Sequence, residues 1–200
     1  YEIKIFKKDC LNFYNSKTID RVKVFNKKYK NMEKVLTING KKTPKLSYLL
    51  KKVDWSSLSD GVPVRFHGDF HFENIIYNKA NATFHFLDWR QDFSGRLDCG
   101  DIYYDFAKLL HGMIVSHEKI VKNKYFVKNK YSNYEYKIER KKESIESEKL
   151  FVEWLINKEF NVKKVYILTA LIFLNIAPLH HSPYDKFLYV LGIDMLNKEL

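Results

Sequence analysis

The chain has 200 residues, of which 46% are hydrophobic and 30% charged, proportions typical of a globular protein large enough to bury its own core. Two cysteines are too few for a disulfide framework and predict a reducing compartment, so we expect a cytoplasmic protein without a signal peptide. The net charge of +11 permits acidic partners. Because neither zinc-finger spacing nor an RNP-type strand accompanies that charge, nucleic acid is not an expected partner.

Residues 1–60 are predicted to form a mostly helical lead-in, since Ile19, Val22 and Phe25 recur at helical spacing. The segment Gly40-Lys41-Lys42-Thr43 does not fit a Walker phosphate loop, because Val35 stands where that motif requires its first glycine. The sequence also contains no G-x-G-x-x-G motif. If the protein binds a nucleotide, we therefore expect a nucleotide-binding lobe upstream of Tyr1.

Within residues 64–88, two acids and an amide, Asp69, Asp88 and Asn74, stand at a spacing that would bring them into one site. Asp69 lies in a polar loop, and Asn74 follows five residues later. Two runs of strand-forming residues, 75–77 and 83–87, flank a short turn and predict a β-hairpin that ends at Asp88. Because a hairpin brings the start of its first strand beside the end of its second, we expect Asn74 and Asp88 side by side, with Asp69 close to both.

This arrangement suits magnesium-dependent phosphoryl transfer. Mg²⁺ takes oxygen ligands, usually one or two protein groups together with water and phosphate oxygens, and Asn74 and Asp88 can supply them. The attacking hydroxyl must be aimed at the phosphorus and must lose a proton, and the loop carboxylate of Asp69 can serve both needs.

Three motifs carry a family resemblance: HGDFHFEN at 67–74, FLDW at 86–89 and GDIYYDFAKLL at 100–110. In this order they resemble the aminoglycoside phosphotransferase and choline kinase family, whose fold is that of the protein kinases, and the match covers the C-terminal catalytic lobe. The resemblance implies ATP or GTP as the phosphate donor and Mg²⁺ as the metal ion. The chain differs from many members of the family at Arg90, two residues after Asp88, where those members carry an acid.

The same resemblance implies roles for individual residues. Asp69 is expected to be the catalytic base, and Asn74 and Asp88 the ligands of the metal and nucleotide. Asp101 and Asp105 are expected to support the loop. Asp105 lies in the first turns of a predicted helix near its apolar face, so its carboxylate needs donors, and the backbone amides of the loop are the natural ones.

Two histidines of the loop allow more than one interpretation. His67 can contact the cofactor or the substrate, although a packed ring that holds the loop by hydrogen bonds is the favoured alternative. His71 is interpreted in the same way, as a supporting residue. His67, Asp69 and His71 also alternate along an extended segment, which leaves open a metal site of the metallohydrolase type.

The remaining residues, 111–200, are predicted to form a helical subdomain that contains a polar excursion or strand pair at 118–142. The most apolar run, Val165–Leu179, is interrupted by Thr169 and Asn175 and is about 15 residues long, shorter than the roughly 20 that a membrane span needs, so it predicts a buried helix. A further helix is expected from Glu143 to Phe160. Its inward residues are expected to be Ile145, Leu150, Phe151, Trp154 and Leu155.

The predicted fold class is therefore α+β and predominantly helical: the C-terminal lobe of a kinase-like fold with a small catalytic β-hairpin, whose catalytic core is 61–110. The predicted activity is transfer of a nucleotide's terminal phosphate to a hydroxyl of a small molecule, with a non-catalytic binding or scaffold module as the alternative. Nine basic residues between Lys119 and Lys142 favour a neutral or anionic sugar or polyol as the acceptor. A cationic amino alcohol stays possible because of the aromatic residues nearby. These are Trp89, Tyr103, Tyr104 and Trp154.

Overall fold

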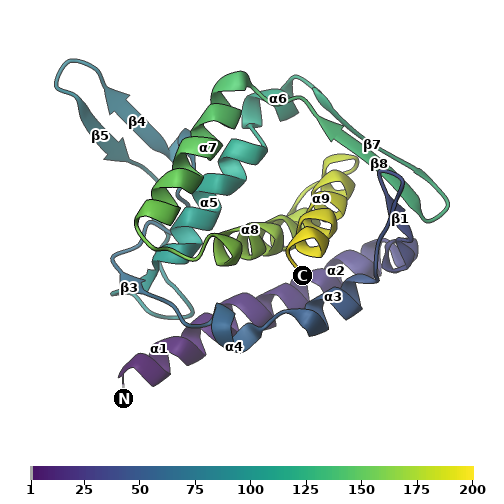
Figure 1. The fold of residues 1–200 in the computed structure, drawn as a ribbon, viewed down its shortest axis with the longest axis horizontal. Helices are drawn as coiled ribbons and strands as arrows, with labels where there is room; N and C mark the ends of the chain where they lie inside the picture. The colour runs from purple at the N-terminus through teal and green to yellow at the C-terminus, as the bar shows by residue number, and fades with distance from the viewer. Residues whose placement is uncertain (1) are drawn as a thin grey trace.

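The computed structural model describes residues 2–200, apart from the side chains of Asn31 and Glu33. The chain begins with a long helical rod along one side of the molecule (Figure 1). It consists of α1 (Glu2–Leu11), a π-helical turn (Asn12–Ser16) and α2 (Lys17–Lys28). Phe6, Cys10, Phe13, Tyr14 and Phe25 form its buried face.

Three helices form the centre of the core: α5 (Ile102–Ile114), α8 (Val162–Ile176) and α9 (Tyr184–Glu199). Helix α7 (Lys142–Asn157) lies beside α5 (Figure 1). The segment Val162–Leu179 is long and apolar enough to cross a membrane by composition, but 61% of it is buried within the protein, as in a core helix. The predicted buried helix is thus present.

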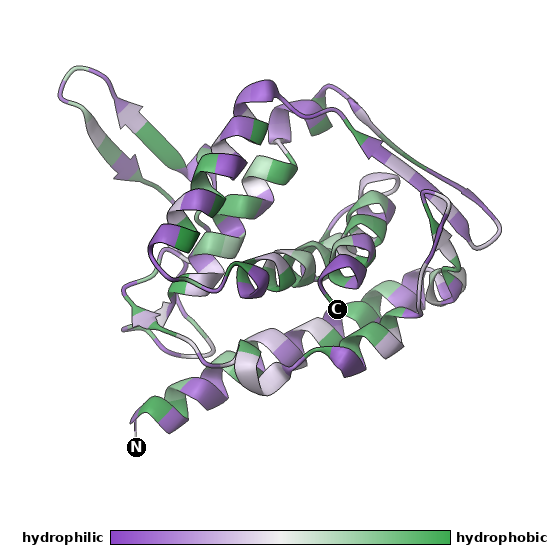
Figure 2. Cartoon of the chain, in the orientation of Figure 1, coloured by the Kyte–Doolittle hydropathy of each residue, from purple (hydrophilic) through white to green (hydrophobic). Residues whose placement is uncertain are grey.

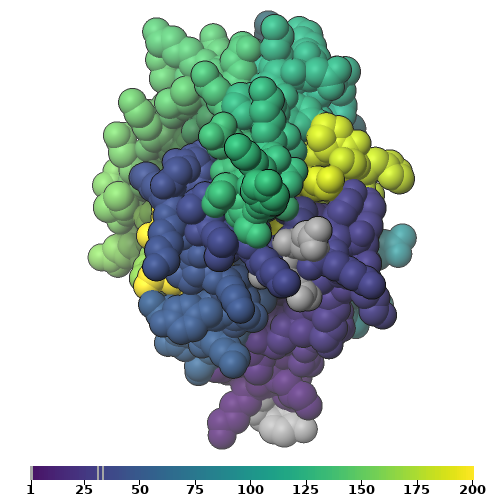
Figure 3. Space-filling model, turned by 90° about the vertical axis from the view of Figure 1, so that its right-hand side faces the viewer, coloured from purple at the N-terminus to yellow at the C-terminus, as the bar shows by residue number. Residues whose placement is uncertain are grey.

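The strands form three small sheets within the described part of the chain. The largest has the order β2-β1-β8-β7, and its β1 runs parallel to β8 across some ninety-five residues of sequence. Its strands are β1 (Thr37–Ile38), β2 (Lys41–Lys42), β7 (Tyr125–Lys130) and β8 (Asn133–Ile138). Figure 3 shows this face, where the β1–β2 region lies against the β7–β8 hairpin.

The other two sheets border the predicted site. Strand β3 (Pro63–Val64) pairs with β6 (Gly100–Asp101), and β4 (Ile75–Asn78) pairs with β5 (Thr83–Phe86). The β4–β5 hairpin projects from the body of the molecule (Figure 1). It is mostly exposed, including apolar residues such as Phe84.

Short helices connect these elements. They are η2 (Lys30–Lys34), α3 (Leu46–Lys52), α4 (Trp55–Leu58), η3 (Phe72–Asn74), α6 (His117–Val121) and η4 (Ala177–Leu179). The predicted α+β class with predominantly helical content is confirmed. The prediction of inward residues in α7 was wrong for three of the five: Ile145, Leu150 and Trp154 are 37%, 66% and 43% exposed. Leu155 is fully buried and Phe151 is partly buried, as expected. In Figure 2 the β7–β8 hairpin is mostly hydrophilic, in keeping with its charged sequence.

Candidate functional site

The loop from His67 to Asn74 is held at its start by Asp105, on the first turns of α5. One carboxylate oxygen of Asp105 accepts a hydrogen bond from the amide of His67 and the other from the amide of Gly68, both at 2.7 Å. Burial raises the pKa of Asp105, and the two amides counteract part of that rise. The expectation that backbone amides of the loop donate to this carboxylate is therefore confirmed.

Gly68 is required by the shape of this loop. Its φ is +78°, and a Cβ atom built on it would lie 2.4 Å from Cβ of Arg90. Another residue would be strained both by its backbone and by that contact. The close approach brings the chain after Asp88 against the start of the loop, where the amide of Arg90 donates to the carbonyl of His67 at 2.8 Å.

His67 does not line either cavity around Asp69, and its expected contact with a cofactor is not supported. The side chain is packed instead: Nδ1 accepts from the amide of Asp69 at 3.2 Å, and the ring centre lies 4.9 Å from that of Trp89. Nε2 is buried without a hydrogen-bond partner among the described residues. The alternative of a packed histidine that holds the loop describes this geometry.

Asp69 lies between two cationic side chains. One of its carboxylate oxygens is 2.6 Å from Nζ of Lys108, and the other is 3.4 Å from Nε2 of His71. Burial acts to raise the pKa of Asp69, but the bonds to His71 and Lys108 outweigh it and hold the pKa well below its usual range. Asp69 is therefore a carboxylate at neutral pH.

His71 links Asp69 to a second acid. Its Nδ1 lies 2.8 Å from a carboxylate oxygen of Glu73, and the bonds to Asp69 and Glu73 together raise the pKa of His71 to about 9. The ring is thus protonated at neutral pH, which supports the position expected for it beside Asp69. A metal site of the metallohydrolase type does not form here: within residues 2–200, no group of three His, Cys, Asp or Glu could hold an ion.

Asn74 and Asp88 are brought together by the base of the hairpin, where the amide of Leu87 donates to the carbonyl of Asn74 at 2.9 Å. Nδ2 of Asn74 donates to the carbonyl oxygen of Asp69 at 3.0 Å and lies 3.3 Å from its carboxylate. That orientation leaves the amide oxygen of Asn74 for another ligand. Asp88 is exposed and makes no hydrogen bond or ion pair with a described residue. An amide oxygen and a carboxylate are oxygen donors that fit Mg²⁺.

Asp101 supports a different part of the structure from the one expected. It is fully buried and caps the start of α5 through the amide of Tyr103 at 3.2 Å. It also accepts from the hydroxyl of Tyr14 at 2.7 Å and from the amide of Val62 at 2.9 Å. None of these partners belongs to the loop 67–74, so Asp101 joins the first helical rod to α5 rather than buttressing the loop.

Two cavities meet at Asp69 and Lys108. The first, of about 350 Å³, is lined by both predicted acids, Asp69 and Asp88, and by several basic side chains, and we call it the basic cavity. Its polar and charged lining residues are Lys17, Arg21, Asp69, Asp88, Arg90, Tyr104, Lys108 and Asn175. The second, of about 500 Å³, contains His71, Glu73 and His111 and is here called the histidine cavity.

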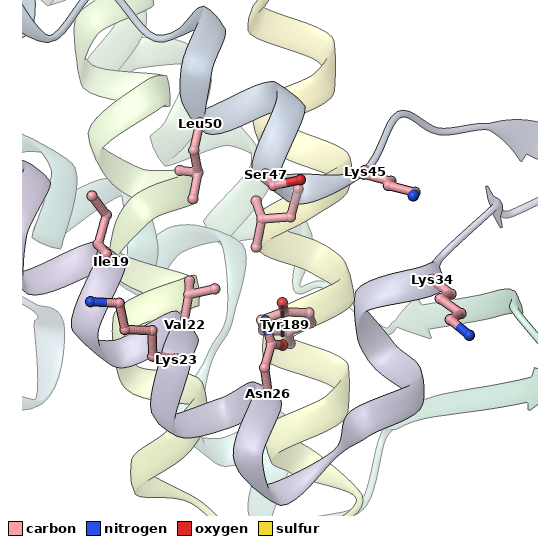
Figure 4. A pocket seen from close by; sticks show the side chains of 10 residues that line it. Ile19, Val22, Lys23, Asn26, Lys34, Lys45, Ser47, Leu50 and Tyr189 are labelled. Atoms are coloured by element: carbon pink, nitrogen blue, oxygen red, sulfur yellow. Dashed lines mark hydrogen bonds between the residues drawn. The ribbon is translucent and has the colours of Figure 1, made fainter.

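A third cavity, of about 380 Å³, lies elsewhere, between α2, α3 and α9 (Figure 4). Its lining combines Val22 and Leu50 with the lysines Lys23, Lys34 and Lys45. None of the predicted site residues reaches it. We therefore place the candidate active site at the two cavities that share Asp69.

Lys108 is the main residue that sequence reasoning missed. It is 8% exposed, although lysine is rarely buried without a partner. The signal was its position three residues after Asp105, inside an otherwise apolar helix, because residues three apart on a helix lie on one face. Lys17 and Arg21 were also missed, since nothing local connects α2 with a loop some fifty residues later.

One comparison with known proteins gives a match. A model of the phosphotransferase enzyme family matches residues 29–129, a range that contains the whole loop, the hairpin and α5. No curated protein and no solved structure matches the chain. The match extends over half of the chain, and the chain therefore belongs to the phosphotransferase enzyme family.

Proposed function

We propose that this chain is the catalytic lobe of a kinase that transfers the terminal phosphate of ATP or GTP to a hydroxyl of a small molecule, with Mg²⁺ as the metal ion. The observation that carries the proposal is the geometry around Asp69. Its carboxylate and that of Asp88 line the same cavity, and Asn74 is bonded to Asp69. The base and one oxygen donor thus face the same cavity, and the second donor, Asn74, is bonded directly to the base.

Asp69 acts mainly by orienting the attacking hydroxyl. A carboxylate whose pKa is held low by Lys108 and His71 is a weak base, so it gains little by removing the proton early. Phosphoryl transfer passes through a loose transition state in which positioning and charge stabilisation dominate. The hydroxyl donates a hydrogen bond to Asp69, is aimed at the phosphorus, and releases its proton to Asp69 late in the reaction.

Asn74 and Asp88 would hold the magnesium ion, through the amide oxygen and the carboxylate. The ion, when bound, neutralises negative charge on the phosphates. Asn74 has a second task, because its Nδ2 also holds the carboxylate of Asp69 in place. The distance between base and metal ligand is therefore set by a direct hydrogen bond.

The proposal includes a nucleotide-binding lobe outside these 200 residues. The sequence has no glycine-rich phosphate loop, and the exposed apolar residues of the β4–β5 hairpin form a face that such a lobe would cover. On that face lie Tyr77, Phe84 and Phe86, since Tyr77 pairs directly with Phe84 and the side chains of a strand alternate between its two faces. We place the protein in the cytoplasm, where ATP and Mg²⁺ are available and where the free thiols Cys10 and Cys99 would be stable.

The test is phosphoryl transfer by the full-length protein from labelled ATP or GTP to a panel of sugars, polyols and amino alcohols, with and without Mg²⁺. We expect transfer to at least one acceptor, dependent on Mg²⁺ and lost in Asp69→Asn. Asp98→Asn is the matched control, because this side chain is 72% exposed and remote from both cavities. A full-length protein that neither transfers phosphate nor shows a Mg²⁺-dependent thermal shift with nucleotide would instead be a scaffold.

A further inference from the structure

Three cations line the basic cavity without a carboxylate partner among the described residues: Lys17, Arg21 and Arg90. Lys17 and Arg90 both lie over the ring of Phe13, at 4.4 and 5.1 Å from its centre. The fourth cation of this cavity, Lys108, is neutralised by Asp69. Like charges gathered in one half-buried space repel each other, so the arrangement is one that a bound anion would stabilise.

The state of Lys17 reflects this crowding. Burial and then the neighbouring charges of Arg90, Arg21 and Lys108 lower the pKa of Lys17 to about 8. The site therefore holds positive charge at a free-energy cost. The other two unpaired cations are arginines, Arg21 and Arg90, whose planar guanidinium groups suit the paired oxygens of phosphate and carboxylate.

Asn175 adds a second kind of recognition to the same cavity. It belongs to α8, where it interrupts a run of apolar residues, and its amide oxygen is buried without a hydrogen-bond partner among the described residues. An unpaired buried oxygen is costly unless a ligand supplies a donor. A hydroxyl group is the donor that suits this oxygen, because the unpaired cations Lys17, Arg21 and Arg90 of the same cavity would repel a ligand amine.

We propose that the basic cavity binds the acceptor substrate, and that this acceptor is a sugar or polyol that already carries a phosphate or carboxylate group. Lys17, Arg21 and Arg90 bind the anionic group, Asn175 accepts a hydrogen bond from one hydroxyl, and Asp69 receives the hydroxyl that is to be phosphorylated. This inference rests on the proposed function for the last step only. The phosphates of the nucleotide share this chemistry, but the Mg²⁺ that Asn74 and Asp88 would hold would neutralise part of their charge.

The first experiment measures the anion site alone, by calorimetric titration of the full-length protein with inorganic phosphate. We expect the double variant Lys17→Gln/Arg21→Gln to bind phosphate about tenfold more weakly or worse, because two charge-assisted contacts are lost. Lys23→Gln is the matched control, since Lys23 lies on the same helix, is 67% exposed and lines the cavity of Figure 4. Equal phosphate affinity in wild type and double variant overturns the anion site. Thermal unfolding of the double variant shows whether it is folded.

The second experiment identifies the source of the anion by steady-state kinetics with matched acceptors, each sugar or polyol compared with its phosphate and its acid. We expect activity only with the anionic member of a pair. In the double variant the KM for that acceptor should rise about tenfold or more while the KM for ATP changes little, and Arg21→Lys should restore part of it. A rise in the KM for ATP instead assigns the cations to the nucleotide and overturns the acceptor assignment.

The two proposals fail in different ways. If no acceptor is phosphorylated but phosphate binding still depends on Lys17 and Arg21, the proposed function fails and the anion site is supported. If neutral acceptors are phosphorylated as well as anionic ones, the proposed function is supported and the acceptor class is wrong. Asn175→Leu adds a check: it should weaken acceptor binding and leave the affinity for inorganic phosphate unchanged.

Discussion

The two carboxylates of the candidate site are held very differently. Asp69 is bonded to Lys108, His71 and Asn74, and every one of these contacts lies in a half-buried setting. Asp88, at the end of the hairpin, is exposed and has no hydrogen-bond partner among the described residues, with a backbone φ of 51°. One acid is fixed by the fold, and the other is left open to solvent.

The difference follows from the task proposed for each residue. A group that aims a hydroxyl must be in place before the reaction, and a half-buried carboxylate such as Asp69 is kept there by groups that compensate for its lost hydration. A metal ligand is ordered by the ion that it binds, so it can remain hydrated until then. The fold therefore supplies polar contacts to Asp69 and none to the side chain of Asp88 among the described residues.

The largest effect is expected for Asp69→Asn. The amide cannot accept the proton of the attacking hydroxyl, and it leaves Lys108 without its charge partner. We expect kcat to fall on the order of a hundredfold or more. Steady-state kinetics with the best acceptor checks this, with Asp98→Asn as the control. Activity within a few-fold of wild type would falsify the role of Asp69.

Asp88→Asn should separate the two carboxylates most clearly. Since Asp88 is exposed, we expect the thermal midpoint to stay close to that of wild type, because surface substitutions usually change stability by less than about 0.5 kcal/mol. Activity at limiting Mg²⁺ should nevertheless fall roughly ten- to hundredfold, because loss of one of few ligands weakens metal binding. A Mg²⁺ titration of the rate should recover part of the loss. If the loss is the same at every Mg²⁺ concentration, Asp88 does not hold the metal.

Asp105→Asn tests the support of the loop rather than its chemistry. The carboxylate accepts two backbone amides, whereas an asparagine offers one oxygen and turns its NH₂ group towards the other amide. Leaving that buried amide unpaired should lower the free energy of unfolding by about 1–3 kcal/mol. Urea denaturation measures it. Asp98→Asn again serves as the control, and an equal midpoint for both variants would exclude a structural role for Asp105.

The parts of the site that are local in sequence could be predicted from it. The hairpin follows from two runs of strand formers around a turn, and the inward position of Asp105 follows from helical spacing. These patterns have periods of two and 3.6 residues, which a single stretch of sequence displays. The family resemblance added the expected roles.

The rest could not be predicted because it depends on contacts between distant parts of the chain. Lys17 and Arg21 reach the basic cavity only because the first helical rod packs beside α8. In the same way, β1 pairs with β8, which follows it by some ninety-five residues. The exposure of Leu150 has the same origin, since the neighbours of α7 decide which of its apolar residues are covered. Periodicity shows which side of a helix is apolar, but it does not show how far the buried region extends around the helix. That extent is set by packing against the neighbouring elements.

His71→Gln is the mildest of the changes and probes the loop's electrostatics through pH. The pKa of His71 is raised to about 9 from an ordinary value of 6.5, so its ion pairs with Asp69 and Glu73 contribute stability that is fully present below about pH 6.5 and is lost as pH rises through 9. The contribution of Asp69 to stability has the opposite pH dependence: because its pKa is lowered, the contribution is present above about pH 4 and is lost only in strong acid.

Glutamine keeps a side chain of similar reach without the charge. The thermal midpoint of wild type should therefore exceed that of His71→Gln by a constant margin near pH 6, and the margin should shrink steadily between pH 6.5 and 9. Parallel curves across that range would show that the charge on His71 does not hold Asp69, and Lys108 would then carry the pairing alone.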